Sequence, residues 1–338
     1  MNGNSEYVEG AKKLIAEGLR LKVTDNLIIV ATESKINVAM YIVEAAKALE
    51  IDDILLIQTP EILRPITKVS ETLSAAVTKA KALIHVIDRQ PEEDFRFNRP
   101  LRTVCAQNRC MYCFLYDPVP CYLKEGINAN YAMVEEKCKK IAEILEESER
   151  IDVKTDLGTS FSFSIYNESV EIHGPVFAED EFIKQAPDGE VSACPVSDTF
   201  NGKVVVDGPI TSVGPPTTPI SWTFKDGKTV GVDGDERFLG GLLGVLKRAD
   251  KMVCSLIGIW IAEFAIGGNE WAVLDDNISN SEKVVGTIHI GMGRTDWVLG
   301  PDRGETFHFD SVITNCTMHI TTMDGRKIRL LESGRLTI

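Results

Sequence analysis

The chain has 338 residues, of which 44% are hydrophobic and 25% charged, as in ordinary soluble globular proteins. Its formal net charge of −14 argues against nucleic acid and against a membrane surface as partners. The polar, acidic N-terminus does not read as a secretory signal, and the longest apolar run, 252–261, is too short to span a bilayer. We therefore expect a cytoplasmic protein with reduced cysteines.

The first 150 residues predict alternating helices and strands. Helical periodicity occurs at 6–17, 36–49 and 72–82, and short apolar strands occur at 26–32, 53–58 and 83–88. This order predicts a doubly wound parallel sheet covered by helices, followed by a helix over 131–146. No G-x-G-x-x-G segment follows the first strand, so a dinucleotide site is not expected.

The pattern changes near residue 150. Apolar and polar side chains now alternate, as in half-buried antiparallel strands, at 151–155, 160–165, 169–173, 203–207 and 220–224. A helix is predicted over 233–249, and strands return at 314–320 and 329–338. We predict an α/β domain over 1–150 and a strand-rich α+β domain, which binds metal, over 151–338.

This second domain contains imidazole and carboxylate side chains at the spacing of neighbours on one face of a β-strand. In the triplet His308-Phe309-Asp310 the two polar side chains share one face, because side chains alternate along a strand. His289, which follows Gly286 in a second short segment, would add a third ligand from another strand. Such a set suits a hard or borderline divalent metal.

Two glutamates in the same half are candidates to complete the site. Glu263 interrupts an apolar run, and an ionised carboxylate there is costly unless it is paired or ligates a metal. The other interpretation of Glu263 is an exposed acid at a strand end. Glu190 follows Pro187-Asp188-Gly189, and by itself it is a loop acid with no assigned role.

The order of these motifs resembles the aminopeptidase T / aminopeptidase S metallopeptidase family (leucyl aminopeptidase T-like). The segments that carry the resemblance are 187–191, 194–195, 201–208, 262–267, 281–293 and 308–310. In that family the centre is dinuclear, with two Glu, two His and one Asp as ligands. Carried over residue by residue, the ligands fall on Glu190, Glu263, His289, His308 and Asp310.

This resemblance implies a hydrolase with a divalent metal, two ions of Zn, Co or Mn per chain. A water activated by the two metals would cleave an N-terminal peptide bond or a small amide, and Glu190 or Glu263 would accept its proton. The resemblance also implies a small-molecule or peptide substrate and a homodimer.

One position departs from the family pattern and keeps alternatives open. A family Tyr, which could stabilise an oxyanion, is replaced here by Asp296. The same fold family includes 2,5-dihydroxypyridine dioxygenase, which holds a single Fe(II) with the two His and the Asp and lacks the two Glu. A ring-cleaving dioxygenase is therefore the alternative function, and a non-catalytic family member is the second alternative. The two glutamates favour the hydrolase.

Four cysteines lie close together in the sequence, Cys105, Cys110, Cys113 and Cys121. Their C-x4-C-x2-C opening is similar to iron–sulfur ligand spacing, and four thiolates would also suit Zn. The surrounding aromatic and aliphatic residues favour another interpretation, in which each thiol is packed as a small buried hydrophobe. We prefer the packing interpretation.

Overall fold

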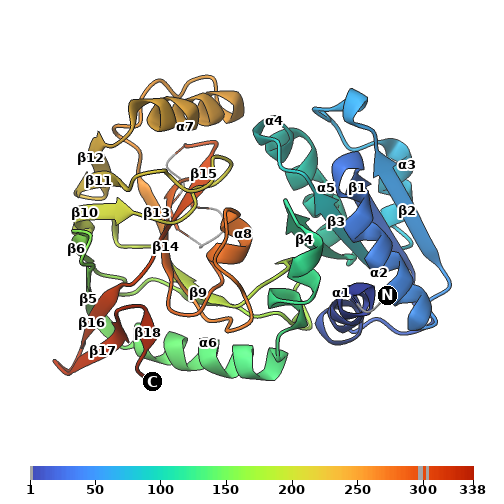
Figure 1. Ribbon diagram of the computed structural model, residues 1–338, viewed down its shortest axis with the longest axis horizontal. Coiled ribbons are helices and arrows are strands. Elements are labelled where there is room, and N and C mark those ends of the chain that lie inside the picture. Colours follow the sequence, from blue (N-terminus) through green and yellow to red (C-terminus); the bar gives the residue numbers. More distant parts are fainter. Residues whose placement is uncertain (1–2, 296–299, 302–303) are drawn as a thin grey trace. The chain divides into compact units, whose positions relative to one another are not determined.

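The computed structural model describes residues 3–295, 300–301 and 304–338 (Figure 1). It is a mixed α/β structure with one parallel and two antiparallel sheets, which confirms the predicted fold class. Two compact units each combine several segments: unit 1 is Met1–Val134, Gly174–Asp188 and Glu270–Val273, and unit 2 is Glu135–His173, Gly189–Asn269 and Leu274–Ile338. Independent folding of residues 1–150 and 151–338 stays a prediction.

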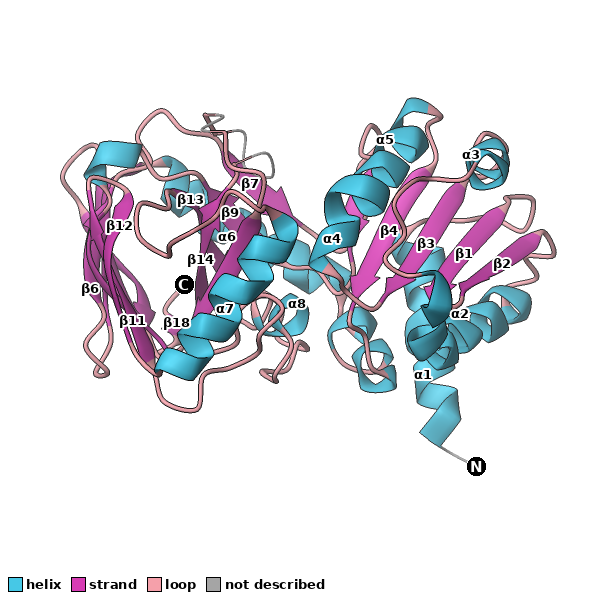
Figure 2. Cartoon of the chain, turned by 90° about the horizontal axis from the view of Figure 1, so that it is seen from above, coloured by secondary structure: helices cyan, strands magenta, loops and turns pink. Residues whose placement is uncertain are grey.

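Unit 1 is built on a parallel five-stranded sheet with the order β2-β1-β3-β4-β8 (Figure 2). Its strands are β1 Leu27–Thr32, β2 Ile54–Thr59, β3 Ala82–Ile87, β4 Met111–Tyr116 and β8 Ile183–Gln185. Its helices are α1 Gly3–Lys13, α2 Ile36–Ala48, α3 Glu71–Val77, α4 Pro91–Glu93 and α5 Arg99–Gln107. The sequence analysis assigned no strand or helix to β4 and α5, which carry Cys113 and Cys105 of the cysteine-rich segment.

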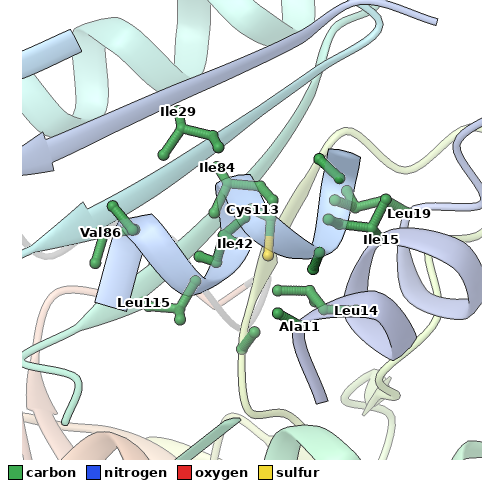
Figure 3. Packing of buried hydrophobic residues seen from close by; sticks show 14 of the residues in the cluster. Ala11, Leu14, Ile15, Leu19, Ile29, Ile42, Ile84, Val86, Cys113 and Leu115 are labelled. Atoms are coloured by element: carbon green, nitrogen blue, oxygen red, sulfur yellow. The ribbon is translucent and has the colours of Figure 1, made fainter. Parts of the chain in front are cut away.

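Two hydrophobic clusters cover the two faces of this sheet. In the first, Leu14 and Ile15 after α1 and Ile42 of α2 pack against Ile29 and Ile84 (Figure 3). The second cluster, which contains residues of α3 and α5, includes the neighbouring strand residues, which point the other way. Helices on both faces make β1, β3 and β4 fully buried strands, as the doubly wound arrangement requires.

Unit 2 contains two antiparallel sheets. The eight-stranded sheet has the order β12-β11-β10-β6-β5-β16-β17-β18, and the five-stranded sheet has the order β15-β14-β13-β9-β7. Its strands are β5 Ser148–Lys154, β6 Ser160–Phe163, β7 Val170–His173, β9 Glu190–Ala193, β10 Asn201–Val206, β11 Ile220–Lys225, β12 Lys228–Asp233, β13 Ile261–Gly267, β14 Ile288–Gly293, β15 His308–Ile313, β16 Thr317–Thr322, β17 Lys327–Glu332 and β18 Arg335–Leu336.

The remaining helices are α6 Tyr131–Glu146, α7 Glu236–Ala249 and α8 Ile278–Ser281. Short 3-10 or π turns occupy Leu14–Gly18, Glu33–Lys35, Glu61–Leu63, Asp94–Asn98, Pro120–Leu123, Gly126–Asn128 and Ser197–Thr199. Within the described ranges, no helix is both long enough and apolar enough to cross a membrane.

Aromatic side chains join the two sheets of unit 2. The ring of Phe163 on β6 lies 4.7 Å from that of Phe264 on β13, and the ring of Trp222 on β11 lies 6.0 Å from that of Phe309 on β15. Burial of such large rings is a major stabilising contribution to a core. One face of the five-stranded sheet therefore packs in the core, and the other face is available for polar groups.

Candidate metal centre

The register of the five-stranded sheet places the polar candidates on one face. In the β13–β14 pair, Glu263 lies opposite Gly291 and Ala265 lies opposite His289. In the β14–β15 pair, Gly291 lies opposite Asp310. Residues directly opposite each other share a face of an antiparallel sheet. The side chains of Glu263, His289 and Asp310 therefore point to the same side.

The side chains of the other two candidates, His308 and Glu190, point to the same side of the sheet. His308 lies opposite Gly293, two residues beyond Gly291, and Glu190 lies opposite Gly267 on β13. An irregularity in β13 between Ile261 and Glu263 shifts the register by one residue, and such bulges often re-aim a side chain next to a site. All five predicted ligands thus lie on the face that points away from the aromatic core.

Glu190, Glu263 and His289 form the first group. Each offers one ligand atom, and these atoms lie within 4.8 Å of one another. His289 Nε2 is 3.8 Å from Glu190 Oε2 and 3.9 Å from Glu263 Oε1. These separations exceed hydrogen-bond distance, yet they suit a metal ion between the atoms, since Zn–N and Zn–O bonds are each about 2.0–2.2 Å.

Glu263, His308 and Asp310 form the second group. His308 Nε2 lies 2.9 Å from Asp310 Oδ1 and 3.3 Å from Glu263 Oε2. The other ring nitrogen, Nδ1, lies 2.6 Å from the carbonyl oxygen of Arg294. A carbonyl only accepts, so Nδ1 carries the proton, and Nε2 of the neutral ring is left to bind a cation.

The sequence pattern anticipated a set of His289, His308 and Asp310 around one ion. Within the described part of the chain, His289 instead groups with Glu190 and Glu263, while His308 groups with Asp310. Glu263 belongs to both groups. Gly291 of β14 lies opposite both Glu263 and Asp310, so only a residue without a side chain separates Glu263 from the second group.

In the first group, Oε2 of Glu190 lacks a hydrogen-bond partner among the described residues, and it belongs to a side chain that is 8% exposed. A buried polar atom without a partner is costly, and a bound ion is one of its ordinary explanations. Carboxylate oxygens and imidazole nitrogens are suitable ligands for Zn, Co or Mn. The residues present therefore fit a divalent metal.

Gly291 makes room for the second group. A Cβ atom at this position would lie 2.7 Å from Cε1 and Nε2 of His308 and 2.8 Å from Cβ of Glu263. Such approaches are too close for non-bonded carbon atoms. A glycine in a strand interior often marks a close approach of this kind, and the Gly-Met-Gly pattern at 291–293 was the signal available in the sequence.

Lys283 is the charged residue of the site that the sequence analysis missed. Its Nζ lies 2.5 Å from Glu190 Oε1 and 3.1 Å from Glu282 Oε1, and its side chain is 4% exposed. The loop that carries it is joined to the end of β13 by the hydrogen bond from Asn269 N–H to the carbonyl of Lys283, at 2.9 Å. One oxygen of Glu190 is thus neutralised by an ammonium group, while the other faces His289.

The carboxylates change the protonation of both histidines. Burial alone would lower the pKa of His289, but Glu190, Glu282 and Glu263 together raise it above its ordinary value. Burial also opposes a charge on His308, yet Asp310 and Glu263 raise its pKa well above the ordinary range. The site thus attracts positive charge, which is supplied either by protons or by metal ions.

Among the described residues, the cysteine candidates do not extend this site, and Asp296 lies outside the described residues. Cys105 and Cys110 are buried in the second hydrophobic cluster of unit 1, where their thiols are hydrogen-bonded to each other. Cys113 is buried in the first cluster, on the opposite face of the sheet, and Cys121 packs against that first cluster. The four thiols therefore do not converge on one point, and they pack as hydrophobic side chains, as the preferred interpretation expected.

The comparisons place this chain among known folds. No family model and no curated protein matches the sequence. The structure of AmpT, an aminopeptidase T from Thermus thermophilus, matches with a TM-score of 0.71 at 15% identity, over 99% of this chain and 99% of that chain. A 2,5-dihydroxypyridine dioxygenase from Pseudomonas putida KT2440 matches with a TM-score of 0.70 at 14% identity, over 100% and 98%. At these identities the shared feature is the fold.

Proposed function

We propose that the protein is a metal-dependent hydrolase of the aminopeptidase type, which cleaves an N-terminal peptide bond or a small amide. One observation carries the proposal. Glu263 belongs to both ligand groups, with Oε1 3.9 Å from His289 and Oε2 3.3 Å from His308. A carboxylate shared between two ligand sets is suited to two-metal hydrolysis, in which the ions lie about 3.5–4 Å apart.

In this proposal each group holds one ion. Glu190, Glu263 and His289 would hold the first, and Glu263, His308 and Asp310 the second. When bound, two such ions supply a lowered pKa for the attacking water and polarise the scissile carbonyl. The full-length similarity to the fold of AmpT supports this assignment.

The protein's own side chains have separate roles. Lys283 holds Glu190 through Oε1, so Oε2 is the oxygen left to hold the first ion. Asp310 is oriented by Thr211, whose Oγ1 accepts from the backbone N–H of Asp310 at 2.9 Å and donates to Asp310 Oδ2 at 3.4 Å. His308 is oriented by the Arg294 carbonyl. These contacts fix the groups before substrate binds, which lowers the cost of organising the reaction.

The test is hydrolysis of aminoacyl amides and short peptides by protein loaded with Zn, Co or Mn. We expect release of the N-terminal residue without oxygen uptake, and loss of activity in Glu263→Ala. A protein that holds two ions and cleaves none of these substrates would contradict the proposal. The substrate class, a homodimer and a cytoplasmic location belong to the same proposal and are tested separately.

A ring-cleaving Fe(II) dioxygenase is the second candidate. The similarity of the fold to 2,5-dihydroxypyridine dioxygenase, at a TM-score of 0.70, supports it, and His289, His308 and Asp310 would be the ligands of its single Fe(II). Oxygen consumption by the Fe(II)-loaded protein with 2,5-dihydroxypyridine would favour this candidate. It would be rejected by amide hydrolysis that proceeds equally well in the absence of oxygen.

A further inference from the structure

The helix that follows β3 in unit 1 has an irregular turn near its start. It begins as α4 at Pro91 and continues as α5 to Gln107, and a π turn over Asp94–Asn98 lies between these two parts (Figure 2). The backbone N–H of Arg99 closes this turn by donating to the carbonyl of Asp94. A single π turn inside an α-helix is rare and occurs frequently at functional sites, so this end of the helix is a candidate binding region.

Three guanidinium groups lie close to this turn and to the end of β4. Arg99 Nε donates to Asp94 Oδ2 at 2.7 Å, and Arg102 donates to the hydroxyl of Tyr116. The guanidinium of Arg89, which follows β3, lies over the Tyr116 ring at 4.0 Å from its centroid. Burial would raise the pKa of Asp94, but the three guanidinium charges lower it below its ordinary value. Asp94 is therefore within reach of three positive charges.

This cluster lies at the edge of the parallel sheet where ligands usually bind. In the order β2-β1-β3-β4-β8 the chain turns from one side of β1 to the other, which makes a switch point between β1 and β3. Ligands of open α/β sheets bind beyond the carboxyl ends of the strands at such a point. Arg89 comes two residues after the end of β3. Solvent reaches this edge, because the side chains of Arg89, Arg99 and Asp94 are 17%, 16% and 31% exposed.

Asn98, in the same π turn, is a second and independent sign of a ligand. It is 1% exposed, and both polar atoms of its amide, Oδ1 and Nδ2, are buried without a hydrogen-bond partner among the described residues. A buried amide of this kind is costly, and a bound group that it can contact is an ordinary explanation. Its Nδ2 can donate two hydrogen bonds to an oxyanion.

We propose that Arg89 and Arg99, with Asn98 beneath them, bind the phosphate group of a small molecule. Guanidinium groups match the oxygens of phosphate in pairs and stay charged. A tetrahedral dianion accepts from both arginines at once, whereas a carboxylate satisfies only one of them. Arg102, which is 3% exposed, lies deeper and adds its charge. This phosphate site is in unit 1 and uses none of the candidate metal ligands, so it goes beyond the proposed hydrolase function.

Binding of inorganic phosphate, measured by calorimetry, tests the phosphate site. We expect the wild type to bind phosphate more tightly than acetate. Arg89→Gln and Arg99→Gln should each weaken phosphate binding by about tenfold, as loss of a hydrogen bond between charged groups does. Arg109→Gln is the matched control, because Arg109 is 73% exposed and pairs with the exposed Asp180 at 3.8 Å. Phosphate should bind this variant and Glu263→Ala as it binds the wild type.

Asn98→Leu separates contact with a ligand from a structural role. Without phosphate, this variant should be no less stable than the wild type in urea, because it removes a buried amide that has no partner. Added phosphate should stabilise the wild type more than Asn98→Leu. A lower stability of Asn98→Leu without phosphate would count against its place in the site.

Three results would overturn the phosphate site. One is a wild type that does not bind phosphate, and another is equal affinity for phosphate and acetate. The third is phosphate binding that is lost in Glu263→Ala and kept in both Arg89→Gln and Arg99→Gln, because phosphate would then lie at the candidate metal centre.

Discussion

The ammonium of Lys283 lies 2.5 Å from Oε1 of Glu190, and both side chains are buried, with 4% and 8% of their surface exposed. A buried charge needs an oppositely charged partner, because its hydration is otherwise lost without compensation. The pair therefore links the stability of unit 2 to the chemistry of the candidate site. It also ensures that one oxygen of Glu190 is occupied before any metal binds.

Lys283→Met is expected to destabilise the metal-free protein by about 3–5 kcal/mol, because it leaves Glu190 buried without its cation. Zn should recover part of this loss, since an ion in the first group would neutralise Glu190. Urea unfolding with and without Zn measures both effects. The control is Lys140→Met, which removes an exposed pair with Glu136 and should cause no measurable change. Equal unfolding midpoints for both variants would contradict the prediction.

Gly291→Ala is expected to weaken metal binding by about 10–100-fold, because the added Cβ displaces His308 and Glu263. The circular dichroism spectrum should stay that of the folded protein. Gly244→Ala on α7 is the control: its Cβ meets no atom within 4 Å, so it should keep full metal affinity and gain up to about 1 kcal/mol of stability. Unchanged affinity in Gly291→Ala would show that the second group holds no metal.

Single replacements should separate the two ions. His289→Ala and His308→Ala should each lower the Zn content by one ion per chain, because the two rings belong to different groups. Glu263→Ala should lose both. His319→Ala, at an exposed position of β16, should bind as the wild type does. Elemental analysis after desalting measures the number of Zn ions per chain. Loss of both ions in either histidine variant would favour a single shared site.

His85 predicts an acid-sensitive stability of the sheet in unit 1. Burial, together with the charges of Arg102 and Arg64, lowers its pKa from 6.5 to about 3. As the pH falls below 6.5, the unfolded chain binds a proton that the native His85 does not, so the native state loses stability until about pH 3. The loss is on the order of 5 kcal/mol, at about 1.4 kcal/mol per pKa unit.

The contribution of His85 to this loss of stability is measurable by replacing its imidazole ring. His85→Gln should be less stable than the wild type at pH 7, because it loses the contact between His85 Nδ1 and the Tyr112 hydroxyl, which is 2.6 Å. Between pH 6.5 and 3 the difference in the free energy of unfolding should shrink. A difference that stays constant over this range would mean that His85 takes up its proton equally in both states.

The local sequence of unit 2 singles out part of the candidate site. His308 and Asp310 are two residues apart in a strand, and Glu263 interrupts an apolar run, so their chemistry was visible locally. Glu190 was not visible in this way, because its position depends on pairing with Gly267, far along the chain. Only the resemblance in motif order singled it out.

Lys283 shows where sequence reasoning ends. It reaches Glu190 because its loop is hydrogen-bonded to the segment that follows β13, a long-range contact with no periodic signal. The grouping of the ligands likewise depends on strand order, since Gly291 of β14 lies opposite both Glu263 of β13 and Asp310 of β15.

The metal content of protein purified without chelators tests the central claim most directly. The claim is that Glu190, Glu263, His289, His308 and Asp310 together hold two divalent ions. We predict two equivalents of Zn, Co or Mn per chain by elemental analysis after extensive desalting. Less than one bound dication per chain, under conditions in which the protein is folded, would contradict it.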